Sequence, residues 1–155
     1  MTPAITAAKR AKIEFRVHEY THDPSSESYG TEAAEKLGVS PDRVYKTLVV
    51  SLDGKELAVG VVPVSSMLNL KSMAKAAVAK KVVMAAKSDV ERVTGYVLGG
   101  VSPLGQKKRL KTYIDAPAEK HETMFVSAGR RGLEIELHPS DLRTLTNGIF
   151  ALLSQ

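Results

Sequence analysis

Two apolar runs on either side of an Asp-Gly pair constrain the fold of this chain more than any other feature. KTLVVSL (46–52) and ELAVGVVPV (56–64) flank Asp53-Gly54. An Asp-Gly pair between two such runs is typical of a β-hairpin, because both residues tolerate the positive φ angles of a tight turn. The runs are apolar along most of their length, so we expect these two strands in the middle of a sheet.

The other segments alternate irregularly between helix and strand patterns. Further strands are predicted at 13–20, with Ile13, Phe15 and Val17 on one face, and at 82–85, 112–115, 123–128 and 132–137. Helices are predicted at 2–11 with Thr2 as cap, 31–38 with Thr31 as cap, 69–79, 88–95 with Ser88 as cap, and from Ser140 onward, with a helical turn at Ser40. This order favours one α+β domain over residues 1–155, with a mixed, barrel-like β-sheet surrounded by helices.

Composition excludes several classes of chemistry. The chain has no cysteine, so it has no disulfide, no thiolate metal site and no cysteine nucleophile. It also lacks a P-loop, a GxSxG elbow and an HExxH motif. His18 and His22 have a metal-pair spacing, but they fall on a predicted strand and the loop after it, so we predict no metal and no cofactor. Without a transmembrane run or a signal-peptide pattern, we expect a cytoplasmic protein with no membrane partner.

Positive charge is concentrated in one part of the chain. Residues 71–111 contain ten Lys or Arg against only Asp89 and Glu91, which makes this segment +8 in a chain of net charge +5. A phosphate-facing surface would have this charge, and so would a set of solvated lysines on helices and loops. Both readings stay open.

Three places are candidates for a binding or catalytic site. Lys46 opens an apolar strand, where it either extends to water or meets an anion in a cleft. The run Gly99-Gly100-Val101-Ser102-Pro103 is either a tight loop or a backbone that approaches a ligand closely. Ser127 precedes the basic turn 129–132 and the acidic strand with Glu134 and Glu136, which is otherwise a plain hairpin with a solvated face.

Three strings in order, VYKTLVV, TGYVLGGVSPLGQKK and VSAGRRGLEIEL, resemble the YbaK/EbsC family of bacterial trans-editing factors, above all its YbaK-type Cys-tRNA(Pro) deacylases. The resemblance covers nearly the whole chain. It implies the editing-domain fold of prolyl-tRNA synthetase and hydrolysis of the ester that joins cysteine to tRNA(Pro). It implies two partners, the aminoacylated 3′ end of tRNA and prolyl-tRNA synthetase. In the family the substrate's own thiol is thought to attack the ester, giving a thiolactone, which suits a chain without an evident nucleophile.

The resemblance also implies roles for particular residues. Lys46 matches the essential lysine near the terminal nucleotide, and the loop from Gly99 to Pro103 matches the GXXXP loop, whose backbone, at Gly99 and Gly100 above all, would hold the aminoacyl carbonyl. The implied substrate-binding residues are Tyr20, Tyr29, Thr47, Val101, Ser102, Pro103, Ser127 and Glu134. Tyr29 stands where relatives often have phenylalanine, and Glu134 stands where aspartate is expected.

Two alternatives remain beside the Cys-tRNA(Pro) deacylase. A related enzyme could clear alanine or another small amino acid from tRNA. A non-catalytic module that binds tRNA or a synthetase could keep the fold without the activity, although Lys46 and the GGVSP loop argue against it.

Overall fold

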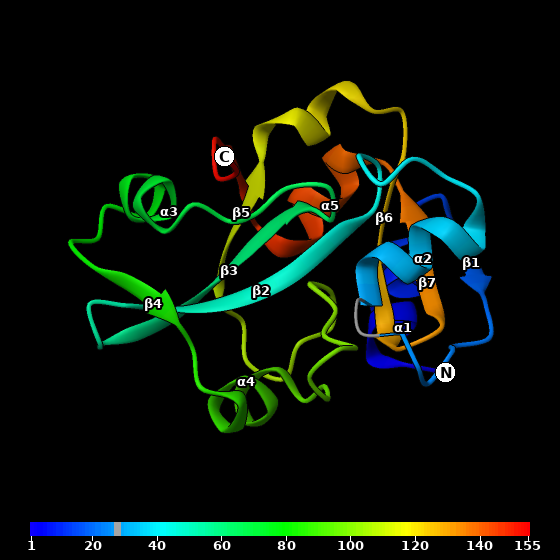
Figure 1. Cartoon of the computed structure of the whole chain (residues 1–155), viewed down its shortest axis with the longest axis horizontal. Coiled ribbons are helices and arrows are strands. Elements are labelled where there is room, and N and C mark those ends of the chain that lie inside the picture. The colour runs from blue at the N-terminus through cyan, green and yellow to red at the C-terminus, as the bar shows by residue number, and fades with distance from the viewer. Residues whose placement is uncertain (27–28) are drawn as a thin grey trace.

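The computed structural model describes residues 1–26 and 29–155, with the side chain of Tyr29 outside the description. In chain order the elements are α1 (Pro3–Ala11), β1 (Phe15–Glu19), α2 (Tyr29–Leu37), β2 (Tyr45–Leu52), β3 (Glu56–Pro63), α3 (Leu70–Ala77), β4 (Val82–Met84), α4 (Lys87–Thr94), β5 (Lys111–Asp115), the 3₁₀ helix η1 (Ala116–Lys120), β6 (Met124–Arg130), β7 (Leu133–Leu137), α5 (Pro139–Thr146) and β8 (Ile149–Ala151). Figure 1 shows α3 and β4 at one end and α1, α2 and β1 at the other.

Two sheets organise the described residues. One is antiparallel with the strand order β1-β7-β6. The other has the order β4-β2-β3-β5-β8, antiparallel around β2 and parallel from β3 to β8. The prediction of a mixed α+β fold is therefore confirmed. Neither sheet closes on itself, so the expected barrel-like sheet is in fact two open sheets.

The predicted hairpin forms the centre of the larger sheet. Leu52 pairs with Glu56, and both Asp53 and Gly54 have positive φ, as a turn with right-handed twist requires. One face of the hairpin packs Val49, Val59 and Val61 against α1, α4 and the smaller sheet. The other face packs Val50 and Val62 against Met73 of α3. Full burial of each such side chain stabilises the fold by roughly 1.5–3 kcal/mol.

Several boundaries differ from the sequence predictions. Thr2 caps α1 as predicted, and Asn69 caps α3. Ala86, not Ser88, is the cap residue of α4, and α2 begins two residues before Thr31. The residues after Ser40 form a turn and not a helical segment. The last predicted helix ends at Thr146, because Asn147 adopts the left-handed conformation, and the chain continues as β8.

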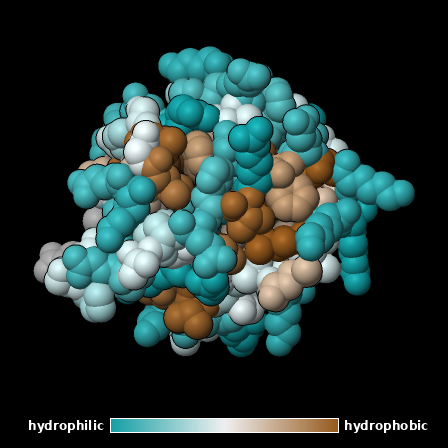
Figure 2. All heavy atoms as spheres, turned by 90° about the vertical axis from the view of Figure 1, so that its right-hand side faces the viewer, coloured by the Kyte–Doolittle hydropathy of each residue, from teal (hydrophilic) through white to brown (hydrophobic). Residues whose placement is uncertain are grey.

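The smaller sheet has an exposed edge at β1. Val17, predicted on a buried face, is 41% exposed. The face of the molecule that carries α2 and β1 is largely hydrophilic, with separate hydrophobic patches between the polar side chains (Figure 2). Among the described residues, every helix is too short or too polar to cross a lipid bilayer.

Candidate active site

The two sheets touch where β2 and β6 begin and then separate. The amide of Phe125 donates to the carbonyl of Arg43 over 2.9 Å, and Val44 forms a parallel bridge with Phe125. Further along, β4 pairs with β2 only at Val50–Leu52, so residues 45–48 of β2 have no strand on that side. The separating strands leave a cavity of about 420 Å³, which we call the fork cavity.

The fork cavity gathers residues from distant parts of the chain. Its lining consists of Tyr20, Gly30, Val44, Tyr45, Lys46, Thr47, Leu48, Leu98, Gly99, Val101, Ser127, Arg130, Arg131 and Glu134. The structure therefore brings seven of the predicted site residues together: Tyr20, Lys46, Thr47, Gly99, Val101, Ser127 and Glu134. It does not bring Ser102 or Pro103 to the lining, and Tyr29 is the first residue of α2 with its side chain outside the described part.

Lys46 supplies a half-buried cation on the free edge of β2. Partial burial lowers its pKa, because a desolvated ammonium group is less stable. No carboxylate among the described residues pairs with it. Lys46 is thus available to an anionic ligand that enters the cavity.

The hydroxyl of Thr47 is buried and has no hydrogen-bond partner in the described structure, and the same holds for the hydroxyl of Tyr45. Leaving a buried hydroxyl unpaired costs about 1–3 kcal/mol. Such groups beside a cavity are suited to hydrogen-bond a ligand when it binds.

Glu134 places a carboxyl group in the wall of the cavity. It is 7% exposed and lies directly between Ser127 on β6 and His18 on β1, so these three side chains share one face of the sheet. Burial raises its pKa to about 8. No described group forms a hydrogen bond or ion pair with it, and its charge in turn helps raise the pKa of Tyr20, after burial.

The glycine loop reaches the cavity through a type II turn. The amide of Gly100 donates to the carbonyl of Val97 over 2.9 Å, and Gly99 has the positive φ that position three of this turn requires. A Cβ atom on Gly100 would lie 2.8 Å from the Cα atom of Arg130. Gly99 therefore lines the cavity, whereas Gly100 uses its amide within the turn and allows the loop to pack against β6.

The rest of the loop is anchored beneath the site. Ser102 is fully buried, and its hydroxyl accepts from the amide of Leu104 over 3.2 Å. On the other side, the amide of Leu98 donates to a carboxylate oxygen of Glu91 on α4 over 2.9 Å. Ser102 and Pro103 thus support the loop from inside the protein.

A second anchor holds the segment that carries Tyr20. Glu32 of α2 is buried, and its two carboxylate oxygens accept from the amide of Asp23 over 2.8 Å and bond to Nδ1 of His22 over 2.6 Å. The amide of Tyr20 donates to the carbonyl of Gly132 over 2.9 Å. These contacts fix the wall of the cavity opposite β2.

A serine–histidine pair is absent from the described contacts. The hydroxyl of Ser127 accepts from the amide of Gly129 over 3.1 Å. His18 bonds to Glu136 over 2.8 Å, His22 bonds to Glu32, and the ring of His121 lies against Tyr45. Among the described residues, no histidine forms a hydrogen bond with Ser127, so its hydroxyl is not paired with the base that a serine nucleophile needs.

Sequence reasoning missed several lining residues. Arg130 and Arg131 were noted only as a basic turn, yet both reach the cavity, and Arg130 also pairs with Glu19 over 3.7 Å. The pairing of β6 with β7 is irregular between Ser127 and Arg130, and the two arginines lie at the end of this irregular stretch. The sequence offers only a glycine at position 129 as a signal, and in the structure Gly129 has a φ of 113° within this stretch.

Comparison with known proteins gives three further findings. A family model described as the aminoacyl-tRNA editing domain matches residues 23–145. The chain is 39% identical over 150 residues to an Enterococcus faecalis protein provisionally named Cys-tRNA(Pro)/Cys-tRNA(Cys) deacylase EbsC, covering 97% of this chain and 91% of that protein. It is 28% identical over 127 residues to the uncharacterized protein YwhH of Bacillus subtilis, covering 82% and 80% of the two chains.

Solved structures include a chain of the same fold. A crystal structure described provisionally as a trans-editing enzyme for prolyl-tRNA synthetase superposes with a TM-score of 0.87. The match covers 99% of this chain and 95% of that chain at 22% sequence identity. At this identity the likeness establishes the fold, including the two open sheets and the helices around them.

Proposed function

This chain belongs to the family of aminoacyl-tRNA editing domains, and we propose that it hydrolyses the ester bond of mischarged Cys-tRNA(Pro) in trans. The observation that carries the proposal is the content of the fork cavity. Among the described residues, its lining includes an unpaired cation, two residues whose buried hydroxyls have no partner and a buried carboxyl, but no nucleophile that is hydrogen-bonded to a base. Such a site is suited to bind a charged substrate that itself supplies the nucleophile.

The substrate would be held at both of its charged ends. Lys46 contacts the phosphate of the terminal nucleotide, where its ammonium group gains the partner that the protein does not provide. Glu134 faces the α-ammonium group of the aminoacyl moiety. Because a bound cation stabilises the carboxylate, substrate binding would lower the pKa of Glu134 from its raised value.

The substrate thiol then attacks the neighbouring ester carbonyl. The sulfur loses its proton and bonds to the carbonyl carbon, the bond from that carbon to the ribose oxygen breaks, and the ribose oxygen takes up a proton. The products are a cyclic thiolactone, which water opens to cysteine, and free tRNA. Holding the thiol beside the carbonyl gives this step a large effective molarity, and the backbone at Gly99 stabilises the negative charge on the carbonyl oxygen.

Prolyl-tRNA synthetase is the proposed protein partner. The editing-domain family acts on aminoacylated tRNA, but a domain of 155 residues has little surface with which to distinguish one tRNA from another. A synthetase that has just selected tRNA(Pro) would supply that selectivity.

A deacylation assay with a panel of charged tRNA(Pro) species tests the proposal. Cysteine, serine, alanine and proline esters are compared under single-turnover conditions. Cys-tRNA(Pro) should be cleaved far faster than Ser-tRNA(Pro), which has nearly the same shape but a weaker nucleophile. Comparable rates on the two, or preferential cleavage of Ala-tRNA(Pro), would contradict the substrate-thiol reaction.

A further inference from the structure

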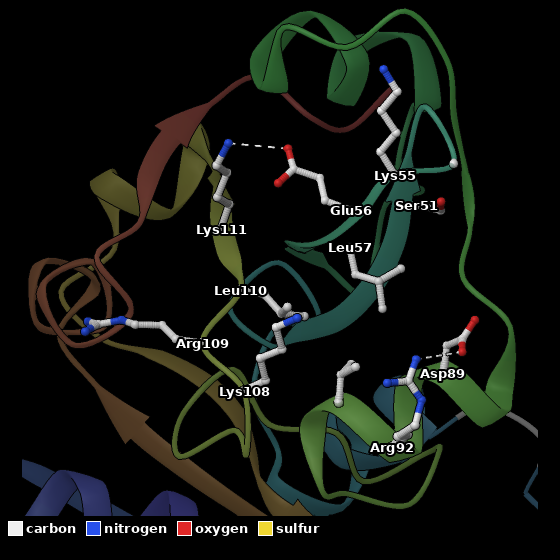
Figure 3. A pocket seen from close by; sticks show the side chains of 12 residues that line it. Ser51, Lys55, Glu56, Leu57, Asp89, Arg92, Lys108, Arg109, Leu110 and Lys111 are labelled. Atoms are coloured by element: carbon white, nitrogen blue, oxygen red, sulfur yellow. Dashed lines mark hydrogen bonds and ion pairs between the residues drawn. The ribbon is translucent and has the colours of Figure 1, made fainter.

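A second and larger cavity lies outside the fork cavity. It measures about 540 Å³ and is bordered by the β2–β3 turn, by α4 and by the segment that leads into β5. Its lining includes five cations, Lys55, Arg92, Lys108, Arg109 and Lys111, and two carboxylates, Glu56 and Asp89. We call this cavity the basic groove. The side chain of Arg109 points away from the groove and its guanidinium group donates to the carbonyl of Leu145 over 3.3 Å, so the other four cations and the two carboxylates give a net charge of +2 (Figure 3).

The cations of the basic groove form few ion pairs with the protein, and these pairs are weak. Lys111 pairs with Glu56 over 3.4 Å and Arg92 with Asp89 over 3.0 Å, and all four side chains are well exposed (Figure 3). Exposed pairs of this kind contribute about 0–1 kcal/mol, so a phosphate displaces the carboxylate at little cost. Lys55 and Lys108 have no ion-pair partner among the described residues.

The basic groove continues along the hairpin end. The amides of Lys80 and Lys81 donate to the carboxylate of Asp53, at 3.0 Å and 2.7 Å, which brings both lysines beside the turn that carries Lys55. These hydrogen bonds use the one acidic group of the turn. Lys80 and Lys81 thus place two further lysines next to the turn at one end of the groove.

The basic groove and the fork cavity share strand β2. Thr47 lines the fork cavity and Ser51 lines the groove, and residues at this spacing project from the same face of a strand. From Thr47 to Ser51 the strand rises about 13 Å. A single RNA strand can span this distance, so one nucleic acid can occupy both sites.

We infer that the basic groove binds backbone phosphates of the tRNA whose 3′ end lies in the fork cavity. The inference rests on the proposed function, because it takes the ligand of the groove from the reaction in the cavity. Phosphates suit the groove because some of its cations form only exposed ion pairs and others form none among the described residues. These cations also come from several elements, as is typical of sequence-independent contact with phosphates.

The test replaces the two lysines that have no ion pair. Lys55→Gln/Lys108→Gln is compared with the matched double variant Lys71→Gln/Lys75→Gln, which removes two exposed lysines from α3. Binding of uncharged tRNA(Pro) is measured between about 50 and 200 mM salt. The groove variant should bind about tenfold more weakly, with a salt slope shallower by about two, and the α3 variant should bind as wild type. An unchanged affinity and slope, or an equal loss in both variants, would overturn the inference.

A minimal substrate separates this inference from the proposed reaction. Cysteine esterified to adenosine reaches only the fork cavity, so the groove variant should cleave it at the wild-type rate. Slow cleavage of the minimal ester by the groove variant would mean that the substitutions disturb the active site, and would count against a separate phosphate site. The wild-type protein could cleave neither Cys-tRNA(Pro) nor the adenosine ester, while tRNA binding still depends on Lys55 and Lys108. That result would contradict the proposed reaction and support the phosphate site in the groove.

Discussion

Ser127 and Glu134 lie directly opposite each other on the antiparallel strands β6 and β7, and both line the fork cavity. The serine hydroxyl is engaged by the amide of Gly129, and the glutamate has no partner among the described residues. The pair sets a buried acid beside a hydroxyl without the imidazole that would activate it. This arrangement favours a positioning role for Ser127 over a nucleophilic one.

Ser127→Ala is therefore expected to slow deacylation of Cys-tRNA(Pro) without abolishing it. The loss should be roughly tenfold to a hundredfold, as for one positioning hydrogen bond, whereas loss of a true serine nucleophile costs about a millionfold. Single-turnover rates measure the difference, and mass spectrometry of the wild-type protein during turnover provides the control. An acyl group trapped on Ser127 would contradict the positioning role.

Glu134 gives the stability of the protein an unusual dependence on pH. Its pKa is about 8 in the folded protein and 4.5 for an ordinary glutamate. Between these values the folded protein keeps a proton that the unfolded chain has released. The free energy of unfolding therefore falls as the pH rises, by at most about 1.4 kcal/mol per pH unit.

Glu134→Gln removes this dependence. Urea unfolding at pH 5 and pH 8 should show that the variant gains stability relative to wild type at the higher pH. Glu35→Gln, at an exposed position on α2, is the matched control and should follow wild type at both pH values. Parallel behaviour of wild type and Glu134→Gln would mean that the carboxyl is not protonated in the folded protein.

Lys46→Ala is expected to remove most deacylase activity and to leave the fold intact. The lysine is half-buried and has no carboxylate partner among the described residues, so none of the described ion pairs is lost when the ammonium group is removed. Lys46→Arg should restore little activity, because the guanidinium group is larger and planar. Circular dichroism and urea unfolding check the fold, and a rate near that of wild type for Lys46→Ala would refute the assignment.

Gly100→Ala tests the contact between the glycine loop and β6. The added Cβ atom would lie 2.8 Å from the Cα atom of Arg130, so one of the two segments must move. We expect a large loss of activity, with a stability cost of about 1–3 kcal/mol, as for an overpacked site. Gly60→Ala is the control, because the nearest atoms there are side-chain carbons and a sulfur at 3.5 Å or more. Equal activity of both variants would show that the position of the loop is unimportant.

The parts of the fold that sequence predicted are those with local causes. Asp53-Gly54 defines its turn within four residues, and Thr2 caps α1 through a contact three residues away. The segment of β8 was predicted as helix, because its strand state arises only from parallel pairing with β5, more than thirty residues earlier. Val17 was assigned to a buried face, although β1 is an edge strand and its position in the sheet cannot be deduced from alternation.

In the candidate site, too, some residues were predictable from local sequence features and others were not. Lys46 stood out because a charged residue opens an apolar strand, and Gly99 because glycines cluster in its loop. Ser102 looked equivalent to Gly99 in the string, but the loop turns inward after Val101 and buries it. Arg130 and Arg131 reach the cavity through an irregularity in β6, which no periodic pattern predicts.

The contact between Arg43 and Phe125 fixes the point from which the two sheets separate, and so it governs the width of the cavity between them. The arginine also packs over the phenylalanine ring, 5.1 Å from its centre, and neither residue lines the fork cavity. Selection for a larger or smaller amino acid can therefore act on the contact between Arg43 and Phe125 while every residue that lines the cavity stays the same. Relatives with identical cavity residues can in this way evolve different amino-acid preferences.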